Sequence, residues 1–420
     1  MQSKVLMVGA GSCQISGIKA LKKRGCQVVV ADYSEASKGK QMADVAVLAD
    51  AFDADAITNC AREQAVDAVI TVGTDQPLLS VVKAAEAMAL PRFIDSDVAY
   101  NVTNKRAMKT IFKTAGIPTM PFAFIDAAFD DEALAHIKPP YVVKPVDSQG
   151  QRGIFKLSTI AAIRAHFGEV IKHSREAVIL VEQYYPNEEV TVSGWVIEGE
   201  AICLTITDRV TFHPDIHIGV CTAHEYPSKY QRRYDKIFKQ LTQQICEAFN
   251  ILAGPIYFQM LVGEAGVVVN EIACRLGGAY EDITIPAATG VDILSLNIEG
   301  AFGKMPKRAD VTPITTGITY FSTQLFFCHP GRVLSQTPVA EIEALPYVLG
   351  TGYNFDVGEF VPPTESASAR AGYVIVTGTS EADLVRHLKA VFQKMQWQNE
   401  AGENMIIEGR RNVREDMNSI

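Results

Sequence analysis

The richest group of chemically capable side chains lies between residues 257 and 278. Gln259 and Glu271 stand in two apolar segments joined by Gly-Glu-Ala-Gly at 263–266, a pattern that predicts an antiparallel hairpin. Across such a hairpin both side chains can point to the same face. Two oxygen ligands suit Mg²⁺, which binds a few protein oxygens together with phosphates and waters. The segment therefore predicts a magnesium site beside a phosphate chain.

Arg275 follows Glu271 by four residues within the same apolar stretch. A guanidinium is a rigid fork of donors that can hold a phosphoryl group while it is transferred. The alternative interpretation is a buried structural ion pair between Glu271 and Arg275. The sequence leaves both interpretations open.

Two lysines and a polar loop are candidates for binding phosphates. Lys105 begins a predicted helix and Lys144 ends a predicted strand, and lysine is a compact cation suited to phosphate oxygens. Either lysine alone is typical of a solvated surface. The loop 147–153 follows Lys144, and its glycines let backbone N–H groups approach phosphates, although it also fits a simple hairpin turn.

A strand ending near Glu182 and Tyr184 offers backbone groups to an adenine ring, and Glu189 can accept hydrogen bonds from ribose hydroxyls. Alone, Glu182 is typical of a solvated charge at a strand end. The loop Gly9–Gln14 begins like a dinucleotide-binding fingerprint and Asp32 follows it, but Gln14 replaces the third glycine. We favour a tight turn without nucleotide there, with an NAD-dependent oxidoreductase as the alternative from another class.

These side chains need a scaffold of several lobes, because 420 residues exceed what one hydrophobic core usually serves. Strand–helix alternation predicts a parallel sheet in the first lobe. Short strands and a helix then predict a small α+β lobe, and hairpins predict a larger antiparallel lobe. The predicted strands and helices that hold the candidates lie at 4–8, 12–23, 27–31, 67–71, 78–89, 104–115, 141–144, 154–157, 159–172, 178–182, 189–197, 201–207, 230–250, 256–262, 267–272, 291–302, 318–326 and 373–376, with a helix from 381.

Composition restricts the partners and the compartment. A net charge of −9 argues against general nucleic-acid or anionic-membrane binding, which needs a basic field. No apolar run approaches the roughly 20 residues that span a bilayer, no signal peptide is evident, and the eight cysteines form no C-x-x-C pair, so we expect a cytoplasmic protein. His213 and His217 have a metal-like spacing, but Pro214 and Asp215 between them argue against zinc.

Taken together, the motifs resemble the ATP-grasp superfamily over nearly the whole chain, most nearly its amino-acid ligases and the synthetase domains of carbamoyl phosphate synthetase. The order and spacing of the pieces carry the resemblance: Asn104-Lys105, Ala115-Gly116-Ile117-Pro118, Val143-Lys144-Pro145, Val181-Glu182-Gln183-Tyr184, Asn270 to Arg275, and Ala288 to Asp292. The resemblance implies an α/β ATP-grasp fold. Its parts would be a Rossmann-like lobe (1–98), a linker helix and ATP lid (99–185), a central antiparallel lobe (186–310) and a C-terminal extension (311–420).

The resemblance also implies a role for each candidate residue. ATP would be bound by Lys105, Lys144, Ser148, Gly150, Gly153, Glu182, Tyr184 and Glu189; Mg²⁺ or Mn²⁺ by Gln259 and Glu271; the substrate by Arg209, Gly277, Gly278 and Tyr280, with Arg275 as the catalytic arginine. Two positions depart from the common pattern. Gln259 stands where many members have Glu, and Ala273 where many have Asn, so the number of metal ions is open.

The implied activity is an ATP-dependent carboxylate–amine ligase that passes through an acyl phosphate and joins amino acids into a dipeptide-like product. Bicarbonate activation, as in biotin carboxylase and carbamoyl phosphate synthetase, is the alternative within the family. The expected partners are small carboxylates and amines. Family members are often dimers, but the sequence leaves the oligomeric state open.

Overall fold

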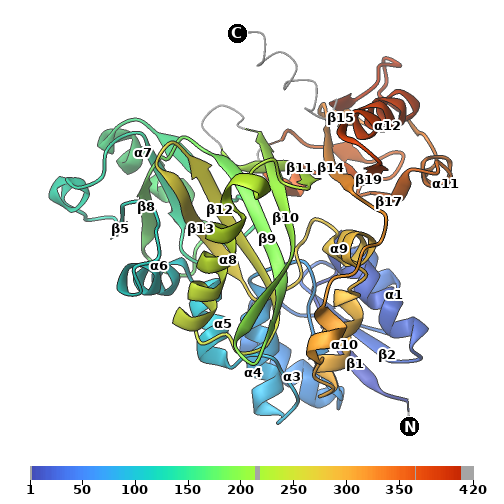
Figure 1. The fold of residues 1–420 in the computed structure, drawn as a ribbon, viewed down its shortest axis with the longest axis horizontal. Coiled ribbons are helices and arrows are strands. Elements are labelled where there is room, and N and C mark those ends of the chain that lie inside the picture. Colours follow the sequence, from blue (N-terminus) through green and yellow to red (C-terminus); the bar gives the residue numbers. More distant parts are fainter. Residues whose placement is uncertain (1, 213–217, 365, 408–420) are drawn as a thin grey trace.

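The computed structural model describes residues 2–212, 218–364 and 366–407 (Figure 1). The N-terminal lobe is a parallel sheet in the order β3-β2-β1-β4, as the strand–helix alternation predicted. The bounds of its strands and helices are β1 Lys4–Val8, α1 Ile15–Lys23, β2 Gln27–Asp32, α2 Lys38–Gln41, β3 Val45–Leu48, α3 Ala54–Glu63, β4 Ala68–Ile70 and α4 Pro77–Ala87. The edge strand β3 was not predicted, because it is only four residues long and half-buried.

The second lobe is a small antiparallel sheet in the order β5-β8-β6-β7. It has its own hydrophobic core, in which Val143 and Val181 of neighbouring strands are fully buried. Helices α5 and α6 connect it to the first lobe. The bounds are α5 Ser96–Thr103, α6 Lys105–Thr114, β5 Phe122–Ile125, β6 Tyr141–Pro145, β7 Phe155–Leu157, α7 Ile160–Ile171 and β8 Ile179–Gln183.

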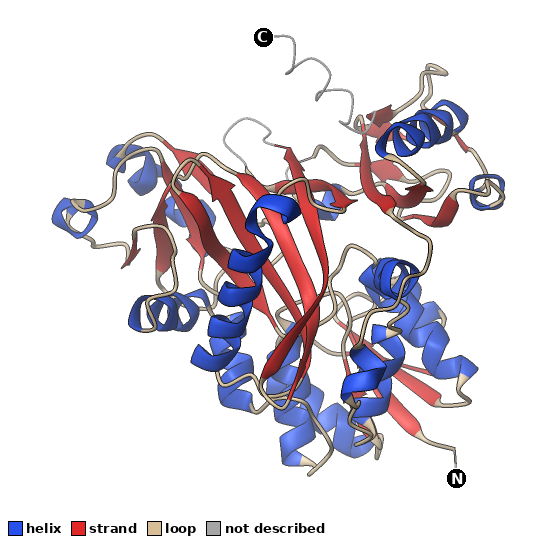
Figure 2. Ribbon diagram, viewed as in Figure 1, coloured by secondary structure: helices blue, strands red, loops and turns tan. Residues whose placement is uncertain are grey.

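A long, twisted antiparallel sheet forms the middle of the molecule (Figure 2). Within the described ranges it has nine strands, in the order β13-β12-β9-β10-β11-β14-β19-β17 with β21 beside β14. Helix α8 lies across β9, β10 and β12 in Figure 1. The bounds are β9 Glu188–Ile197, β10 Glu200–Phe212, β11 Val220–Tyr226, α8 Gln231–Ala248, β12 Gly254–Gly263, β13 Gly266–Ala273, α9 Glu281–Thr289 and α10 Ile293–Ala301.

The C-terminal segment continues this sheet, because β14 pairs with β11 and then with β19. Helix α12 packs on β19 and buries Leu384 and Leu388 there. The bounds are β14 Tyr320–Cys328, β15 Gly331–Arg332, β16 Ser335–Gln336, α11 Val339–Glu343, β17 Val348–Tyr353, β18 Phe360–Val361, β19 Gly372–Gly378, α12 Glu381–Lys394, β20 Trp397–Gln398 and β21 Ile406–Ile407. Residues after 310 are thus joined to the central lobe by backbone hydrogen bonds.

The predicted turn at 198–200 shows how local sequence sets the strand register. Glu198 and Gly199 have φ of 50° and 80°, the left-handed pair that a tight hairpin turn requires. The turn brings Glu200 opposite Ile197 and starts the β9–β10 ladder. None of the described helices is long and apolar enough to cross a membrane.

Candidate active site

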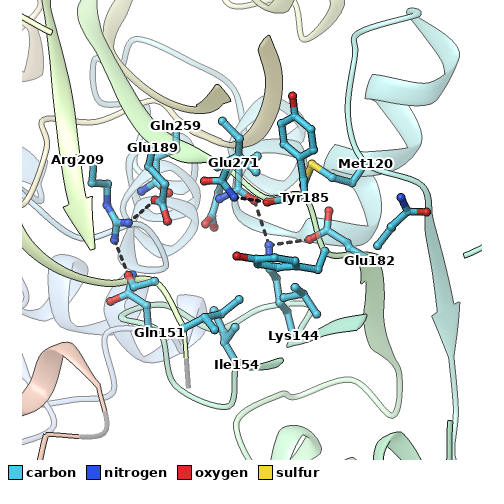
Figure 3. Close-up of a pocket in the computed structure, with 18 residues that line it drawn as sticks. Met120, Lys144, Gln151, Ile154, Glu182, Tyr185, Glu189, Arg209, Gln259 and Glu271 are labelled. Carbon is cyan, nitrogen blue, oxygen red and sulfur yellow. Dashed lines mark hydrogen bonds and ion pairs between the residues drawn. The ribbon is translucent and has the colours of Figure 1, made fainter. Parts of the chain in front are cut away.

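Gln259 and Glu271 are direct cross-strand partners in the β12–β13 hairpin, so their side chains share a face, as predicted. Both line a cavity between the central sheet and the second lobe, which we call the first cavity (Figure 3). The pair presents an amide and a carboxylate group to this space. Such a donor set fits Mg²⁺ that is also bound by phosphate oxygens and water.

Three charged groups form a buried triad at the wall of the first cavity. The Glu182 carboxylate lies 2.6 Å from the Nζ atoms of both Lys109 and Lys144. The Lys109 and Glu182 side chains are each 1% exposed. Burial alone would raise the pKa of Glu182, but the two ammonium groups outweigh it and bring that pKa to about 2. Glu182 therefore serves as the counter-ion of two lysines, rather than as a solvated strand-end charge.

Lys144 also donates a hydrogen bond of 3.0 Å to Asn270 on β13. It thereby connects the second lobe to the strand that carries Glu271. Lys109 was not predicted as a site residue, since it looks like an ordinary polar position of the amphipathic helix α6. Its only sequence signal was the spacing of four residues from Lys105, which places both lysines on one helix face.

Lys105 does not line the first cavity directly. Its Nζ lies 3.1 Å from Glu271 Oε1 and donates to the Ser148 carbonyl at 3.0 Å. The lysine thus bridges the candidate metal ligand and the loop 147–153. Burial raises the pKa of Glu271, but Lys105 and Lys144 pull it below its usual range, so this carboxyl group is ionised.

Arg275 pairs with Asp75, which follows β4 of the N-terminal lobe. Their contacts are 2.5 Å from Nη2 and 2.7 Å from Nε to Asp75 Oδ1. The alternative of a Glu271–Arg275 ion pair is therefore wrong, because each residue has found a partner from another element. Arg275 also lies over the Tyr257 ring, 4.3 Å from its centroid.

The loop 147–153 rests on the N-terminal lobe. The Gln149 side-chain oxygen accepts hydrogen bonds of 3.0 Å from the backbone N–H groups of Asp75 and Gln76. Gly150 and Gly153 have φ of 70° and 71°, a region that glycine adopts without strain. Gly150 lines a second cavity, which is described below. Ser148 and Gly153 line neither that cavity nor the first.

Tyr184 and Glu189, the predicted adenine and ribose contacts, both line the first cavity. The Tyr184 ring has Lys156 Nζ 3.6 Å from its centroid. Glu189 forms an ion pair with Arg209 of β10, which also donates to the Gly219 carbonyl at 3.1 Å. The first cavity is lined by Met120, Val142, Lys144, Gln151, Ile154, Glu182, Gln183, Tyr184, Tyr185, Asn187, Glu189, Arg209, Ile218, Gly219, Gln259, Leu261, Asn270 and Glu271.

A second cavity adjoins the first and shares Gln151, Arg209 and Gln259 with it. Residues from the N-terminal lobe, the central sheet and the C-terminal segment meet around it. Its lining is Cys13, Gly73, Thr74, Asp75, Gln149, Gly150, Gln151, Arg209, Cys221, His224, Tyr257, Gln259, Arg275, Gly278, Ala279, Leu325, Ala367 and Arg370. A path between the cavities therefore passes the candidate metal ligand Gln259.

Two predicted substrate residues lie outside this lining. The Gly277 N–H donates to Glu281 at 2.7 Å, and a Cβ there would collide with the Glu281 carboxylate. Tyr280 is buried and stacks on Tyr373, with ring centroids 3.4 Å apart. Arg209 and Gly278 do line the second cavity. Arg370 also lines the second cavity, although it was not predicted as a site residue. It belongs to a segment that is distant in the sequence from the predicted substrate residues.

Neither the histidines nor the first glycine loop forms a further centre in the described structure. His213 and His217 lie outside the described residues. Burial and three arginines lower the pKa of His224 to about 3, so its ring is neutral. Asp32 accepts from the backbone N–H groups of Ala10 and Ser34 at 2.9 and 2.8 Å, and the buried Gln14 side chain packs under the loop. The loop is thus held as a tight turn by its own polar groups.

Residues 137–282 match the family model described as ATP-grasp domain, and residues 324–400 match the model described as L-amino acid ligase C-terminal domain 2. The chain is an ATP-grasp ligase. Its relatives include the L-arginine-specific L-amino acid ligase of Bacillus subtilis, 24% identical over 306 residues that cover 71% of this chain and 72% of that protein. The D-alanine--D-alanine ligase of Albidiferax ferrireducens is 28% identical over 226 residues, covering 53% and 59%.

Solved structures show the same fold for this ATP-grasp ligase. The L-amino acid ligase from Bacillus licheniformis superposes with a TM-score of 0.77 at 16% identity, covering 95% of this chain and 99% of that one. The phosphoribosylglycinamide synthetase from Anaerococcus prevotii gives 0.75 at 14% identity, covering 95% and 100%. The predicted fold and ligase class are confirmed, and the first glycine loop belongs to an ATP-grasp protein rather than to a dehydrogenase.

Proposed function

We propose that this ligase joins two amino acids through an amide bond, with an acyl phosphate as the intermediate. The observation that carries the proposal is the meeting of two cavities at Gln259. One is lined by the phosphate lysine Lys144 and by Glu271, and the other is closed by the segment that matches an L-amino acid ligase domain. Reactants bound in the two spaces would meet beside Arg275.

ATP would occupy the first cavity, with adenine near Tyr184, ribose near Glu189 and phosphates near Lys144. Lys105 and the loop residues Ser148, Gly150 and Gly153 would surround the phosphate end. Gln259 and Glu271 would hold Mg²⁺ or Mn²⁺, which supplies charge neutralisation for the phosphates. Lys105 forms an ion pair with Glu271, so its ammonium group is close enough to contact the ATP phosphates that would bind beside Glu271.

In the first step a carboxylate oxygen of one amino acid attacks the terminal phosphorus, and ADP leaves. Arg275 stabilises the charge on the transferring group. In the second step the amine of the other amino acid attacks the acyl carbon, loses a proton and expels phosphate. The loop 147–153 covers the site and keeps water from the reactive anhydride.

Bicarbonate activation remains the second candidate, since carboxylases share this fold. The second cavity argues against it, because its lining extends over three parts of the chain and exceeds what a four-atom anion fills. A cytoplasmic location, a homodimer and the division at residues 98, 185 and 310 are further parts of this proposal.

The test is a screen of ATP hydrolysis with amino acids and small carboxylates, each offered singly and in pairs with Mg²⁺. We expect phosphate release that depends on a pair of amino acids, with the matching dipeptide identified by mass spectrometry. Phosphate release that requires bicarbonate and no amino acid would favour the second candidate instead.

A further inference from the structure

The second cavity holds a positive charge that the described protein does not neutralise. Three arginines line it, and two of them are paired: Arg209 with Glu189 and Arg275 with Asp75. Arg370 makes no ion pair with any residue in the described ranges, and its Nε is buried without a hydrogen-bond partner. His224 adds no further positive charge, because its low pKa keeps the ring neutral.

The backbone holds Arg370 firmly at the cavity wall. It lies between a short helical turn at Ala367–Ala369 and strand β19. Its N–H donates to the Ala367 carbonyl at 3.2 Å, and its carbonyl accepts from Asn354 at 2.9 Å. The segment belongs to the part that matches the L-amino acid ligase C-terminal domain.

Arg370 and Arg275 both line the second cavity and share neighbours there. Burial is the main cause of the lowered pKa of His224, and both guanidinium groups add to it. Burial raises the pKa of the Cys13 thiol, and both guanidinium groups oppose that rise. The two arginines therefore face common neighbours from separate lobes, with only Arg275 neutralised by a protein carboxylate.

Two amino acids bring two α-carboxylates into the site, and only one of them reacts. The reacting carboxylate must lie beside Gln259, Glu271 and Arg275. The other carboxylate keeps its charge beside the buried Nε of Arg370, which has no hydrogen-bond partner of its own. A guanidinium can satisfy it with two parallel hydrogen bonds.

We propose that Arg370 binds the unreacted α-carboxylate of the amine substrate and so directs its amine toward the acyl phosphate. This assignment rests on the proposed ligase function. It gives the C-terminal segment a defined role in specificity, since the amine substrate would be recognised by a residue outside the ATP-binding lobes.

The test separates the two half-reactions in Arg370→Ala. The carboxylate substrate is taken as the amino acid that yields most hydroxamate with ATP and hydroxylamine, a small amine without a carboxylate. The amine substrate is then taken as the amino acid that yields most dipeptide with this carboxylate substrate. Its C-terminal amide, which lacks the free carboxylate, is assayed beside it. In Arg370→Ala we expect the KM for the amine substrate to rise about 10- to 100-fold, the effect of losing a charged hydrogen-bonded contact. The hydroxamate rate should fall far less.

The wild-type enzyme should prefer the free acid over the amide, and Arg370→Ala should lose that preference. Arg370→Lys, which keeps the charge without the fork, should give an intermediate KM. Arg386→Ala on α12, whose side chain is 72% exposed, is the matched control and should behave like wild type. Thermal melting of each variant verifies that it is folded.

An equal fall in the hydroxamate and dipeptide rates would overturn the assignment, because it would place Arg370 at the acyl side. An unchanged preference for the free acid in Arg370→Ala would also overturn it. So would a loss limited to acidic amino acids, which would point to a side-chain carboxylate. Failure of the ligase proposal itself looks different: the wild-type enzyme would then form no hydroxamate from any amino acid.

Discussion

Replacing Glu182 by Gln should destabilise the protein through the buried lysine triad. The substitution keeps the size of the side chain but removes the negative charge between Lys109 and Lys144, each 2.6 Å away. Two ammonium groups would then remain in a largely desolvated space without their common counter-ion. Removing one partner of a buried ion pair typically costs about 3–5 kcal/mol.

The depressed pKa of Glu182 gives a second magnitude for the same interaction. The pKa of the Glu182 carboxyl group falls from its ordinary value of 4.5 to about 2, a difference of about 2.5 pH units. At about 1.4 kcal/mol per pH unit, this difference corresponds to about 3 kcal/mol of stability at neutral pH. Because the folded pKa lies below the unfolded one, this stability is fully present above pH 4.5 and is lost as pH falls toward 2.

Urea denaturation followed by far-UV circular dichroism measures this loss at pH 7 and at steps down to pH 3. Glu182→Gln should unfold at a clearly lower urea concentration than wild type at pH 7, and the difference should shrink in acid. Glu169→Gln, which breaks a pair on the surface, is the control and should change little. If Glu182→Gln unfolds at the same urea concentration as this control, the triad does not stabilise the fold.

Three further predictions concern the nucleotide and the chemistry. Glu271→Gln should abolish Mg²⁺-dependent turnover in a protein that remains folded, with a lower melting temperature because buried Lys105 loses its carboxylate partner; normal turnover would exclude the metal role. Calorimetry should show ATP binding in the micromolar to millimolar range typical of substrates and no comparable NAD binding; tight NAD binding that Asp32→Ala removes would contradict the ATP assignment. Arg275→Ala should slow hydroxamate formation by about 10²–10³, and an unchanged rate would remove Arg275 from the phosphoryl-transfer step.

Much of the scaffold could be predicted because it depends on local patterns. The hairpin around residues 263–266 follows from apolar runs beside glycines, and it fixes Gln259 opposite Glu271. The end of β6 likewise places Lys144 at the cavity wall, since the residues before it are apolar and buried. Periodicity and turn residues therefore determined the position of these side chains.

The partners of those side chains could not be predicted, because they come from other lobes. Asp75 is separated from Arg275 by 200 residues, and no local pattern links them. Arg370 stands between two buried alanines with no motif around it. The substrate roles expected for Gly277 and Tyr280 came from the family resemblance. In the structure Gly277 donates a hydrogen bond to Glu281, and Tyr280 stacks on Tyr373.

The most direct test of the central claim is the product balance of the activation step. The enzyme is supplied with ATP, Mg²⁺, its carboxylate amino acid and hydroxylamine, and the nucleotides and hydroxamate are quantified together. An acyl phosphate predicts one ADP and one phosphate for each hydroxamate formed. AMP and pyrophosphate in that proportion would instead mean an acyl adenylate, and would contradict the proposed mechanism.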